Sequence, residues 1–569
     1  MRKRTRTFGT VAVSVILVAA TALAFGKTRV PPAHVLRVGT FNNIPGTYTS
    51  VQAAVLAAQP GDWVLVAPGD YKENGYTGSP EPAGVLIATP GVHLRGMNRN
   101  TVVIDGTVPG SPTCSPAKAD QIFTDGGRDG IIALKVDNVS IENLTVCNYL
   151  TGNSGGEGNE IWWNGGDGSG TIGMGPFYGG YLTATSTYSN GTDHPRGEYG
   201  IFTSNSKGPG LIEHTYASNM GDAAYYIGAC PDCNQILDDA LGQFSALGFS
   251  GTNAGGHLII RNSTFSHNKS GAAPDSQNND DAPSPLDGRC PDPNETSPIS
   301  GTNSCTIWMN NTFDSNNEPN VPGSGSGLAG SSPVGSGLVL AGARYFTLIN
   351  NTFKNNNSWG LLIADLPDQE NPPTDIGQNC QGGISVIPPG LPVTALCYFQ
   401  AFGNDVRDNT FVGNGSYGNP TNGDIALVTT PHLPGNCFSG NTDPAGLTSD
   451  PPAILLQSPL YACGMPNAGD MTLGAIEALC ATELVFPCPD TPITHYPRAG
   501  QVVLSMAPAQ PTMPNPCLNV PANPWCPGGS SSMGFGAGGP LVSTIAVIPW
   551  MMAAAGRRRR PFPTTRGMR

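Results

Sequence analysis

Short apolar stretches with alternating hydrophobic and polar positions recur along most of the chain. Examples are Tyr199-Gly-Ile-Phe, Leu247-Gly-Phe-Ser, Ser336-Gly-Leu-Val-Leu, Trp359-Gly-Leu-Leu-Ile and Asp424-Ile-Ala-Leu-Val. A period of two directs successive side chains to opposite faces, which is the pattern of a β-strand. Because turn residues separate these stretches, the chain is predicted to be all-β with many short strands.

A second phrase recurs beside these strands, in which an aromatic residue is followed three positions later by asparagine. The aromatic residues Tyr216, Phe265 and Phe313 lie 49 and 48 positions apart, which we interpret as two turns of about 24 residues each. Later gaps of 40, 58 and 27 call for insertions or shorter coils. Short strands repeating at such a period predict a solenoid, in which each coil covers the apolar interior of the next.

The asparagines that end this phrase are expected at the corners of the coils. They are Asn219, Asn268, Asn316, Asn356, Asn414 and Asn441. Stacked asparagines can hydrogen-bond to one another and to the turn backbone, and asparagine tolerates the left-handed conformation of tight corners. We therefore predict one structural ladder and no ligand role for these residues.

One helix is predicted ahead of the solenoid. Apolar residues between Tyr48 and Ala58 follow helical spacing, Thr49 or Ser50 can act as the N-cap, and Pro60-Gly61 ends the helix. A strand from Trp63 to Tyr71 follows it. A helix at this position would cover the open apolar end of the first coil, as solenoids require.

The phrases Ser50-Val-Gln-Ala-Ala, Pro60-Gly-Asp-Trp-Val-Leu-Val-Ala-Pro-Gly-Asp-Tyr and Gly91-Val-His-Leu-Arg-Gly resemble the entry of the pectate-lyase-like superfamily. The resemblance covers residues 45–441 and implies a right-handed parallel β-helix (a β-solenoid) with a short N-terminal capping helix. It leaves the activity open, because this scaffold hosts lyases, hydrolases, epimerases, adhesins and proteins without activity.

The ends of the chain differ from this body. Basic residues up to Arg6, an apolar run to Phe25 and an Ala22-Leu23-Ala24 end predict an export signal over residues 1–26, either cleaved or kept as an anchor. A linker is expected over 27–44, the cap and first coils over 45–106, the β-helix over 107–445, and a Pro/Gly/Cys-rich segment over 446–540. An apolar run from Leu541 followed by Arg557–Arg560 predicts a membrane anchor over 541–569, or else a tail with an apolar patch.

The basic residues of these two ends offset much of the negative charge of the rest of the chain. The ends hold ten of the 28 basic residues and none of the 41 acidic ones, so the rest of the chain has a net charge of about −23. Nucleic-acid binding needs clustered lysine and arginine, so the charge argues against that partner. The expected location is the extracellular face of the cell envelope, with the protein either anchored or secreted.

Fourteen cysteines in an exported chain are disulfide candidates. Near pairs that bracket turn-rich segments are Cys290 with Cys305, Cys380 with Cys397, and Cys517 with Cys526. The motif Cys230-Pro-Asp-Cys233 has the spacing of a soft-metal or redox pair, but it offers only two ligands. In an oxidising compartment a local disulfide between Cys230 and Cys233 is the favoured interpretation.

The strongest cluster for contact with a ligand lies in the Gly-rich segment from Gly155 to Asp167. We predict that Trp162 and Trp163 form a platform for sugar rings, with Glu160 and Asn164 binding hydroxyls. The alternative is that both tryptophans fold inward and cover a coil.

A complete catalytic set is not found in the sequence. Asn441-Thr-Asp443 matches one element of the polygalacturonase pattern, but the Gly-His-Gly and Arg-Ile-Lys elements are absent. Calcium is the one cofactor considered, since carboxylates suit it, although a solvated acidic loop is the favoured interpretation of these residues. Its candidate ligands are Asp275, Asp280, Asp281, Asp287 and Asp292.

Three functions are therefore considered. The first is an envelope protein whose β-helix presents a glycan-binding or rigid structural surface. The second is a polysaccharide lyase or glycoside hydrolase that acts on acidic polysaccharide. The third is a metal-handling β-helix that uses Cys230 and Cys233. We favour the first, because the search yields no complete catalytic set.

Overall fold

The computed structural model describes residues 33–74, 82–166, 171–191, 193–278, 286–324, 327–368, 380, 382–386, 396–482 and 488–529. The predicted signal (1–26), the predicted anchor (541–569), Asp280 and Asp281 lie outside these ranges. Across the described ranges, no helix is long and apolar enough to cross a membrane.

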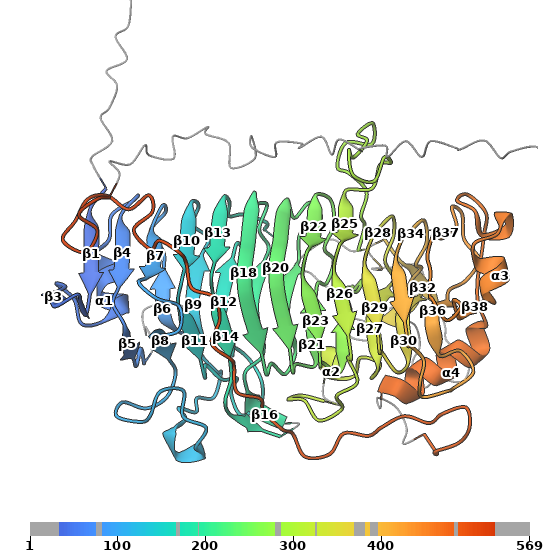
Figure 1. Cartoon of the computed structure of the whole chain (residues 1–569), viewed down its shortest axis with the longest axis horizontal. Helices are drawn as coiled ribbons and strands as arrows, with labels where there is room; N and C mark the ends of the chain where they lie inside the picture. The colour runs from blue at the N-terminus through green and yellow to red at the C-terminus, as the bar shows by residue number, and fades with distance from the viewer. Residues whose placement is uncertain are drawn as a thin grey trace, which may run out of the picture.

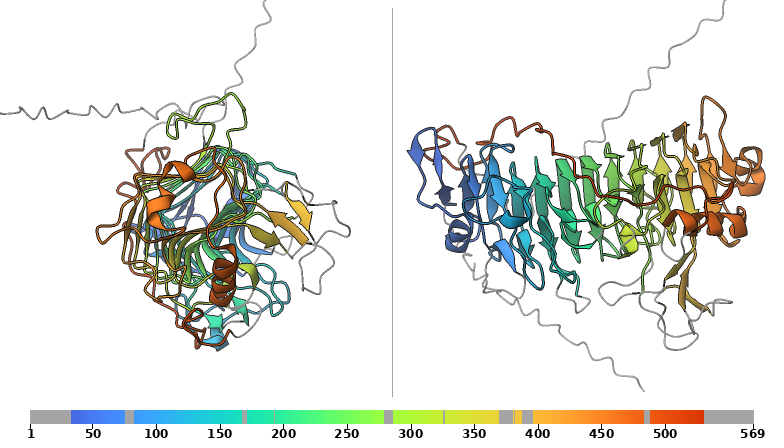
Figure 2. Two further views of the ribbon diagram at one scale, coloured as in Figure 1. Left: turned by 90° about the vertical axis from the view of Figure 1, so that its right-hand side faces the viewer. Right: turned by 90° about the horizontal axis from the view of Figure 1, so that it is seen from below.

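The chain winds into an elongated stack of coils (Figure 1) that enclose a continuous interior when viewed along the axis (Figure 2, left). Two parallel sheets form its walls, one of 20 strands and one of 11. The strands of the 20-stranded sheet are β1 (Val35–Val38), β4 (Trp63–Val66), β5 (Gly69–Tyr71), β7 (His93–Gly96), β8 (Val102–Asp105), β10 (Val139–Glu142), β11 (Thr145–Cys147), β13 (Phe177–Gly180), β14 (Thr183–Thr185), β18 (Gly210–Ser218), β20 (Gln235–Gln243), β22 (Leu258–Arg261), β23 (Thr264–Ser266), β25 (Thr306–Met309), β26 (Thr312–Asp314), β28 (Thr347–Ile349), β29 (Thr352–Lys354), β34 (Asp405–Arg407), β35 (Thr410–Val412) and β37 (Cys437–Ser439).

The 11-stranded sheet receives one strand from each coil. Its strands are β6 (Ala83–Ile87), β9 (Asp129–Leu134), β12 (Ile161–Asn164), β17 (Tyr199–Ser204), β19 (Ala223–Gly228), β21 (Leu247–Ser250), β24 (Ser270–Ala272), β27 (Ser336–Ala341), β30 (Trp359–Ala364), β36 (Gly423–Val428) and β38 (Ser449–Asp450). The β-helix predicted from the repeats is confirmed. Strand β1 begins at Val35, inside the segment expected to be a linker, and pairs with β4.

The remaining elements are short strands and helices at the ends and in the insertions. The small strands are β2 (Thr40–Phe41), β3 (Ile44–Pro45), β15 (Ser189–Asn190), β16 (Asp193–Arg196), β31 (Leu366–Asp368), β32 (Ile384–Val386) and β33 (Leu396–Phe399). The helices are α1 (Val51–Ala57), η1 (Lys118–Asp120), α2 (Gly327–Gly330), α3 (Ala453–Leu456), η2 (Pro459–Tyr461) and α4 (Met471–Thr482). Ser50 caps α1 by accepting from the Ala53 amide at 3.2 Å, which confirms the predicted capping helix.

The aromatic phrase stacks in the interior, but its register differs from the prediction in two places. Phe265 pairs directly with Phe313, so the 48 positions between them span one coil with an insertion and not two coils. Leu241 pairs with both Tyr216 and Thr264, so Tyr216 is one position out of line with Phe265. An insertion lengthens the spacing in the sequence without changing the spacing between coils. The spacing alone therefore cannot distinguish two coils from one coil with an insertion.

The corner asparagines form three ladders instead of one. Side-chain amides donate to the next amide oxygen at 3.1 Å in the first ladder, which is Asn268, Asn316, Asn356 and Asn414. The second ladder is Asn311, Asn351, Asn409 and Asn441, and Asn404 with Asn436 forms the third. Asn441 therefore belongs to a different corner from the one predicted, because Phe438 pairs with Val406 and not with Phe411.

The last described residues run back along the outside of the stack. This segment, residues 497–529, is called the strap; Figure 1 shows it in red, passing from the α4 end to the β1 end. Strap amides donate to side-chain oxygens of asparagines on four separate coils, namely Asn320, Asn219, Asn100 and Asn143. At the β1 end, the indole Nε1 of Trp525 donates to the Ile44 carbonyl at 2.9 Å. The strap therefore ties both ends of the solenoid together.

Candidate functional site

The two adjacent tryptophans of the predicted platform lie on strand β12 and point in opposite directions. Trp163 has 0% of its surface exposed and packs beside Phe177 in the interior, with ring centroids 5.8 Å apart. Trp162 is half-buried and lies on the outer face of the 11-stranded sheet. Neighbouring residues of a strand alternate between faces, so a paired platform is excluded here. Trp163 is a core residue, and only Trp162 remains a candidate for ligand contact.

The two polar members of the predicted site are also enclosed. Glu160 has 0% exposure, and its Oε2 accepts a long bond from the Tyr149 amide at 3.4 Å. Asn164 has 4% exposure and accepts from the Gly166 amide at 2.8 Å. Both side chains are enclosed at the ends of β12 and do not face a ligand. The prediction that they bind hydroxyls is therefore wrong.

Trp162 is part of a larger group of rings, formed by strands that are distant in sequence. Phe202 of β17 stacks on it with centroids 4.8 Å apart and planes at 3°. Tyr226 of β19 meets Phe202 edge-on at 4.8 Å, and Tyr199 lies 4.6 Å from Phe202. The strand register places Trp162, Phe202 and Tyr226 in one outward row across three coils. We call Trp162, Tyr199, Phe202 and Tyr226 the aromatic band.

Carboxylates lie directly beside the aromatic band. The Tyr199 hydroxyl donates to Oδ2 of Asp222 at 2.8 Å. Glu198 lies on the preceding coil, where its carbonyl accepts from the Asp222 amide at 3.0 Å. The Arg196 guanidinium holds the Glu198 carboxylate through two bonds of 2.9 and 3.3 Å. Gly221 makes room for this arginine, because a Cβ there would lie 2.1 Å from its Nε.

The surroundings of Asp222 favour its neutral form. Burial raises the pKa of this carboxyl well above its usual value, and the negative charge of Glu198 adds to the shift. Its second oxygen, Oδ1, is enclosed and has no hydrogen-bond partner in the described structure. Burial likewise raises the pKa of Tyr199, with Asp222 adding to it, so the phenol keeps its proton. One carboxyl that favours its proton thus lies beside a carboxylate that an arginine neutralises.

The acidic residues considered for calcium that the structure describes, Asp275, Asp287 and Asp292, do not come together as a set. Asp275 lies next to the aromatic band, where it accepts from Thr252 and Gln277 at 2.9 Å each. Asp287 is ion-paired with Arg289. Two triplets of the described residues are close enough for a metal ion: Asp105 with Cys114 and Cys147, and His257 with Glu295 and Cys305. Each includes a disulfide-bonded cysteine, whose sulfur offers no thiolate to a metal.

All fourteen cysteines are disulfide-bonded. The four pairs expected from the sequence are present, namely Cys230–Cys233, Cys290–Cys305, Cys380–Cys397 and Cys517–Cys526. Cys230 and Cys233 have 0% exposure, so their sulfurs are neither free ligands nor open to a redox partner. The other pairs are Cys114–Cys147, Cys437–Cys463 and Cys480–Cys488.

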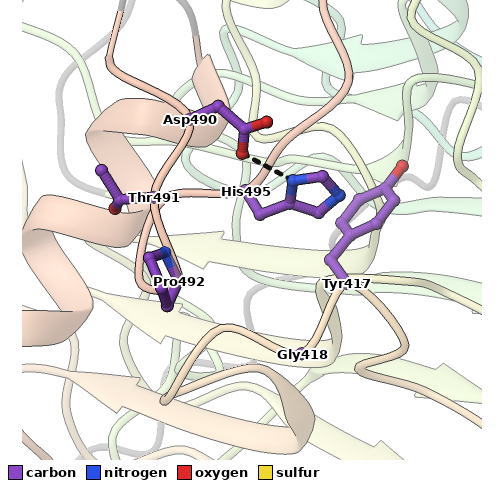
Figure 3. Close-up of a pocket in the computed structure, with 6 residues that line it drawn as sticks. All are labelled: Tyr417, Gly418, Asp490, Thr491, Pro492 and His495. Atoms are coloured by element: carbon purple, nitrogen blue, oxygen red, sulfur yellow. Dashed lines mark hydrogen bonds and ion pairs between the residues drawn. The ribbon is translucent and has the colours of Figure 1, made fainter.

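A second place for ligand contact is an open depression of about 540 Å³ near the α4 end (Figure 3). Its lining includes Tyr417 and the pair His495–Asp490, whose side-chain atoms are 2.7 Å apart. The histidine and aspartate side chains are 61% and 76% exposed, so water screens their charges. The aromatic band combines stacked rings with partly enclosed carboxylates, and it is therefore the better candidate.

Most of this site was missed by the sequence interpretation. Tyr199 and Phe202 lie within a recognised strand phrase and Glu198 directly precedes it, but Asp222 and Tyr226 come from the following coil. Their proximity depends on the register between coils. Aligning the outward positions of successive Gly-centred strands is the signal by which they could have been found.

Comparisons with known proteins bear on the fold alone. No protein-family model matches the chain, and no curated protein is similar to it in sequence. Among solved structures, the A-module of the Azotobacter vinelandii mannuronan C-5 epimerase AlgE4 is 14% identical, with a TM-score of 0.40, over 72% of this chain and 95% of that one. The Yersinia enterocolitica family 28 exopolygalacturonase is 12% identical, with a TM-score of 0.38, over 72% and 75%. Pectate lyase Pel9A is 12% identical, with a TM-score of 0.34, over 67% and 76%.

The chain is thus a right-handed parallel β-helix protein, as the stacked parallel strands of its two long sheets show. At these identities and TM-scores, the similar structures carry no information about which residues act here.

Proposed function

We propose that this is an exported cell-envelope β-helix protein that binds a glycan chain across the outer face of β12, β17 and β19. The observation that carries the proposal is the aromatic band with Glu198 and Asp222 beside it. Aromatic rings offer apolar contact to the C–H groups of sugars, while carboxylates accept hydrogen bonds from hydroxyl groups. The coils of a parallel stack repeat at about 4.8 Å, which suits a ligand that is itself a repeating chain.

Two observations support export and attachment at the envelope. Seven disulfides with no free cysteine are typical of oxidising compartments. The strap brings Trp525 against Phe41 at the β1 end, so the first and the last described residues lie at the same end of the body. Such a protein would stand on the membrane by that end. Recovery of the native protein from the cytoplasm with reduced cysteines would contradict this part of the proposal.

The glycan-binding proposal is tested by substituting Trp162 and Trp163 one at a time and comparing binding with stability. Trp162→Ala should abolish measurable binding in a glycan array while lowering the free energy of unfolding by only about 1 kcal/mol. Trp163→Ala should instead destabilise the protein by roughly 3–5 kcal/mol, because it leaves a cavity in the core. Phe123→Ala removes an exposed aromatic elsewhere and serves as the matched control. A Trp162→Ala protein that binds every glycan normally would contradict the site.

A second function, polysaccharide cleavage, is favoured by one specific observation. Asp222 has a raised pKa while Glu198 is held by Arg196, which is the arrangement of a general acid beside a carboxylate that acts as base or nucleophile. If the protein cleaves its glycan, Asp222→Asn should lower the turnover by roughly 10²–10⁴-fold and leave binding largely intact. A turnover screen of the wild-type protein on the bound glycan decides whether this second function exists.

A further inference from the structure

The charges around the aromatic band are unbalanced. The carboxylates of Glu198 and Asp275 both act on Asp222 at this face, whereas Arg196 is the only cation among the charges that most strongly affect Tyr199 and Asp222 in the described structure. Arg196 already holds Glu198 through two hydrogen bonds and is 2% exposed. It has little capacity left for a carboxylate brought by a ligand.

The polar groups of this face accept hydrogen bonds more readily than they donate them. The Tyr199 hydroxyl donates to Asp222, and the Trp162 Nε1 donates to the Ser204 hydroxyl at 2.9 Å, so both donors are in use. The remaining hydrogen-bonding capacity belongs to the carboxylate oxygens of Glu198 and Asp275, which accept from hydroxyl groups. Sugar hydroxyls match these groups, while a sugar carboxylate would meet acceptors and like charge.

We propose that the aromatic band selects neutral polysaccharides and rejects polyuronates. This inference rests on the proposed glycan-binding function and names the class of glycan. A carboxylate on each sugar would be repelled at short range by Glu198 and Asp275 in a half-buried setting, where water screens charges less than in bulk. The net charge of about −23 on the body adds a longer-range repulsion. This selectivity is the reverse of what was expected for an enzyme acting on acidic polysaccharide.

The test measures binding of the purified full chain by affinity electrophoresis in gels that contain one polysaccharide each. The neutral probes are mixed-linkage β-glucan, galactomannan and soluble starch, and the acidic probes are polygalacturonate and alginate, all with a calcium chelator present. We expect at least one neutral probe to bind and both acidic probes to bind at least roughly tenfold more weakly. Trp162→Ala should abolish binding of the neutral probe, and this loss would locate that binding at the aromatic band.

The charge argument is tested separately from binding itself. The double substitution Glu198→Gln with Asp275→Asn should narrow the difference in affinity between neutral and acidic probes by roughly tenfold. Asp490→Asn removes an exposed carboxylate elsewhere and should leave the difference unchanged. In the wild-type protein, raising NaCl from about 0.02 to about 0.3 M should also narrow the difference, because salt screens the repulsion. This last measurement needs no variant to fold.

Three other outcomes would contradict the proposed selectivity. If polygalacturonate or alginate binds more tightly than every neutral probe and Trp162→Ala abolishes that binding, the glycan site stands and the neutral selectivity is overturned. Acidic binding that appears only after calcium is added also overturns it, since a bridging cation would then recognise the ligand. If the wild-type protein binds none of the five probes, the proposed glycan-binding function fails, and the selectivity fails with it.

Discussion

At the scale of single residues, enclosure decides the role of the acidic groups. Glu160 sits at the start of β12 with no exposed surface, and its Oε1 has no hydrogen-bond partner in the described structure. Burial raises the pKa of this carboxyl well above its usual value, and the charges of Asp105 and Asp129 add to the shift. A carboxyl that the sequence suggested for hydroxyl binding is therefore a buried group whose surroundings favour its protonated form.

This pKa shift predicts how stability depends on pH. Below about pH 4 the carboxyl is protonated in both the folded and the unfolded chain and carries no penalty. As the pH rises toward the folded-state pKa, the unfolded chain loses the proton first, so the free energy of unfolding falls. Glu160→Gln cannot ionise and should be more stable than the wild type at pH 8, with little difference at pH 4.

Denaturant unfolding at the two pH values measures this difference. Glu157→Gln, which changes a less buried acid in the same segment, is the control. An equal effect of Glu160→Gln at both pH values would mean that Glu160 is ionised in the folded protein.

At the scale of elements, aromatic stacking holds successive coils in register. Phe353 of β29 has no exposed surface and lies between Phe313 and Phe411, with centroids 4.8 Å from each. Phe353→Ala should lower the free energy of unfolding by roughly 3–5 kcal/mol, because neighbouring rings cannot collapse into the space. Val412→Ala, at an exposed position of β35, should change it by less than about 0.5 kcal/mol.

Chemical denaturation of both variants checks this prediction. A loss below about 1 kcal/mol for Phe353→Ala would mean that the coil interior tolerates the cavity and that the ladder is not a main source of stability.

At the scale of the whole molecule, the strap joins coils that are far apart in sequence. Trp525 fixes its end, with 3% exposure and contacts to Phe41 and Arg37 at 5.7 Å each. The intervening strap amides donate hydrogen bonds to asparagines on separate coils. Releasing the Trp525 end of the strap should therefore weaken these hydrogen bonds as well. Trp525→Ala should therefore increase amide hydrogen exchange at Gln510 and Met513, with no change in β27 and β30.

Met506→Ala, at a 90% exposed strap position, is the matched control and should leave the exchange unchanged. Unaltered protection of the strap in Trp525→Ala would show that each of its contacts holds independently.

The sequence by itself determined the features that depend on neighbouring residues. Period-two apolar stretches specify strands, Ser50 with Pro60-Gly61 delimits α1, and cysteines a few residues apart, such as Cys230 and Cys233, meet within one loop. A repeated phrase also specifies that the strands stack as a solenoid, because no single coil buries its own apolar face. These outcomes depend on local conformational preference and short loops, which the order of residues records directly.

Only the tertiary structure decided which residues meet across coils. The insertion between Phe265 and Phe313 hides the fact that these rings are direct neighbours, and it misled the repeat count. The same dependence on register separates Trp162 from Trp163 and brings Asp222 to Glu198. Loops of any length can join stacked coils at little extra free-energy cost, so distance along the chain does not report distance in space. For that reason the β-helix was predictable, while the aromatic band and the strap were not.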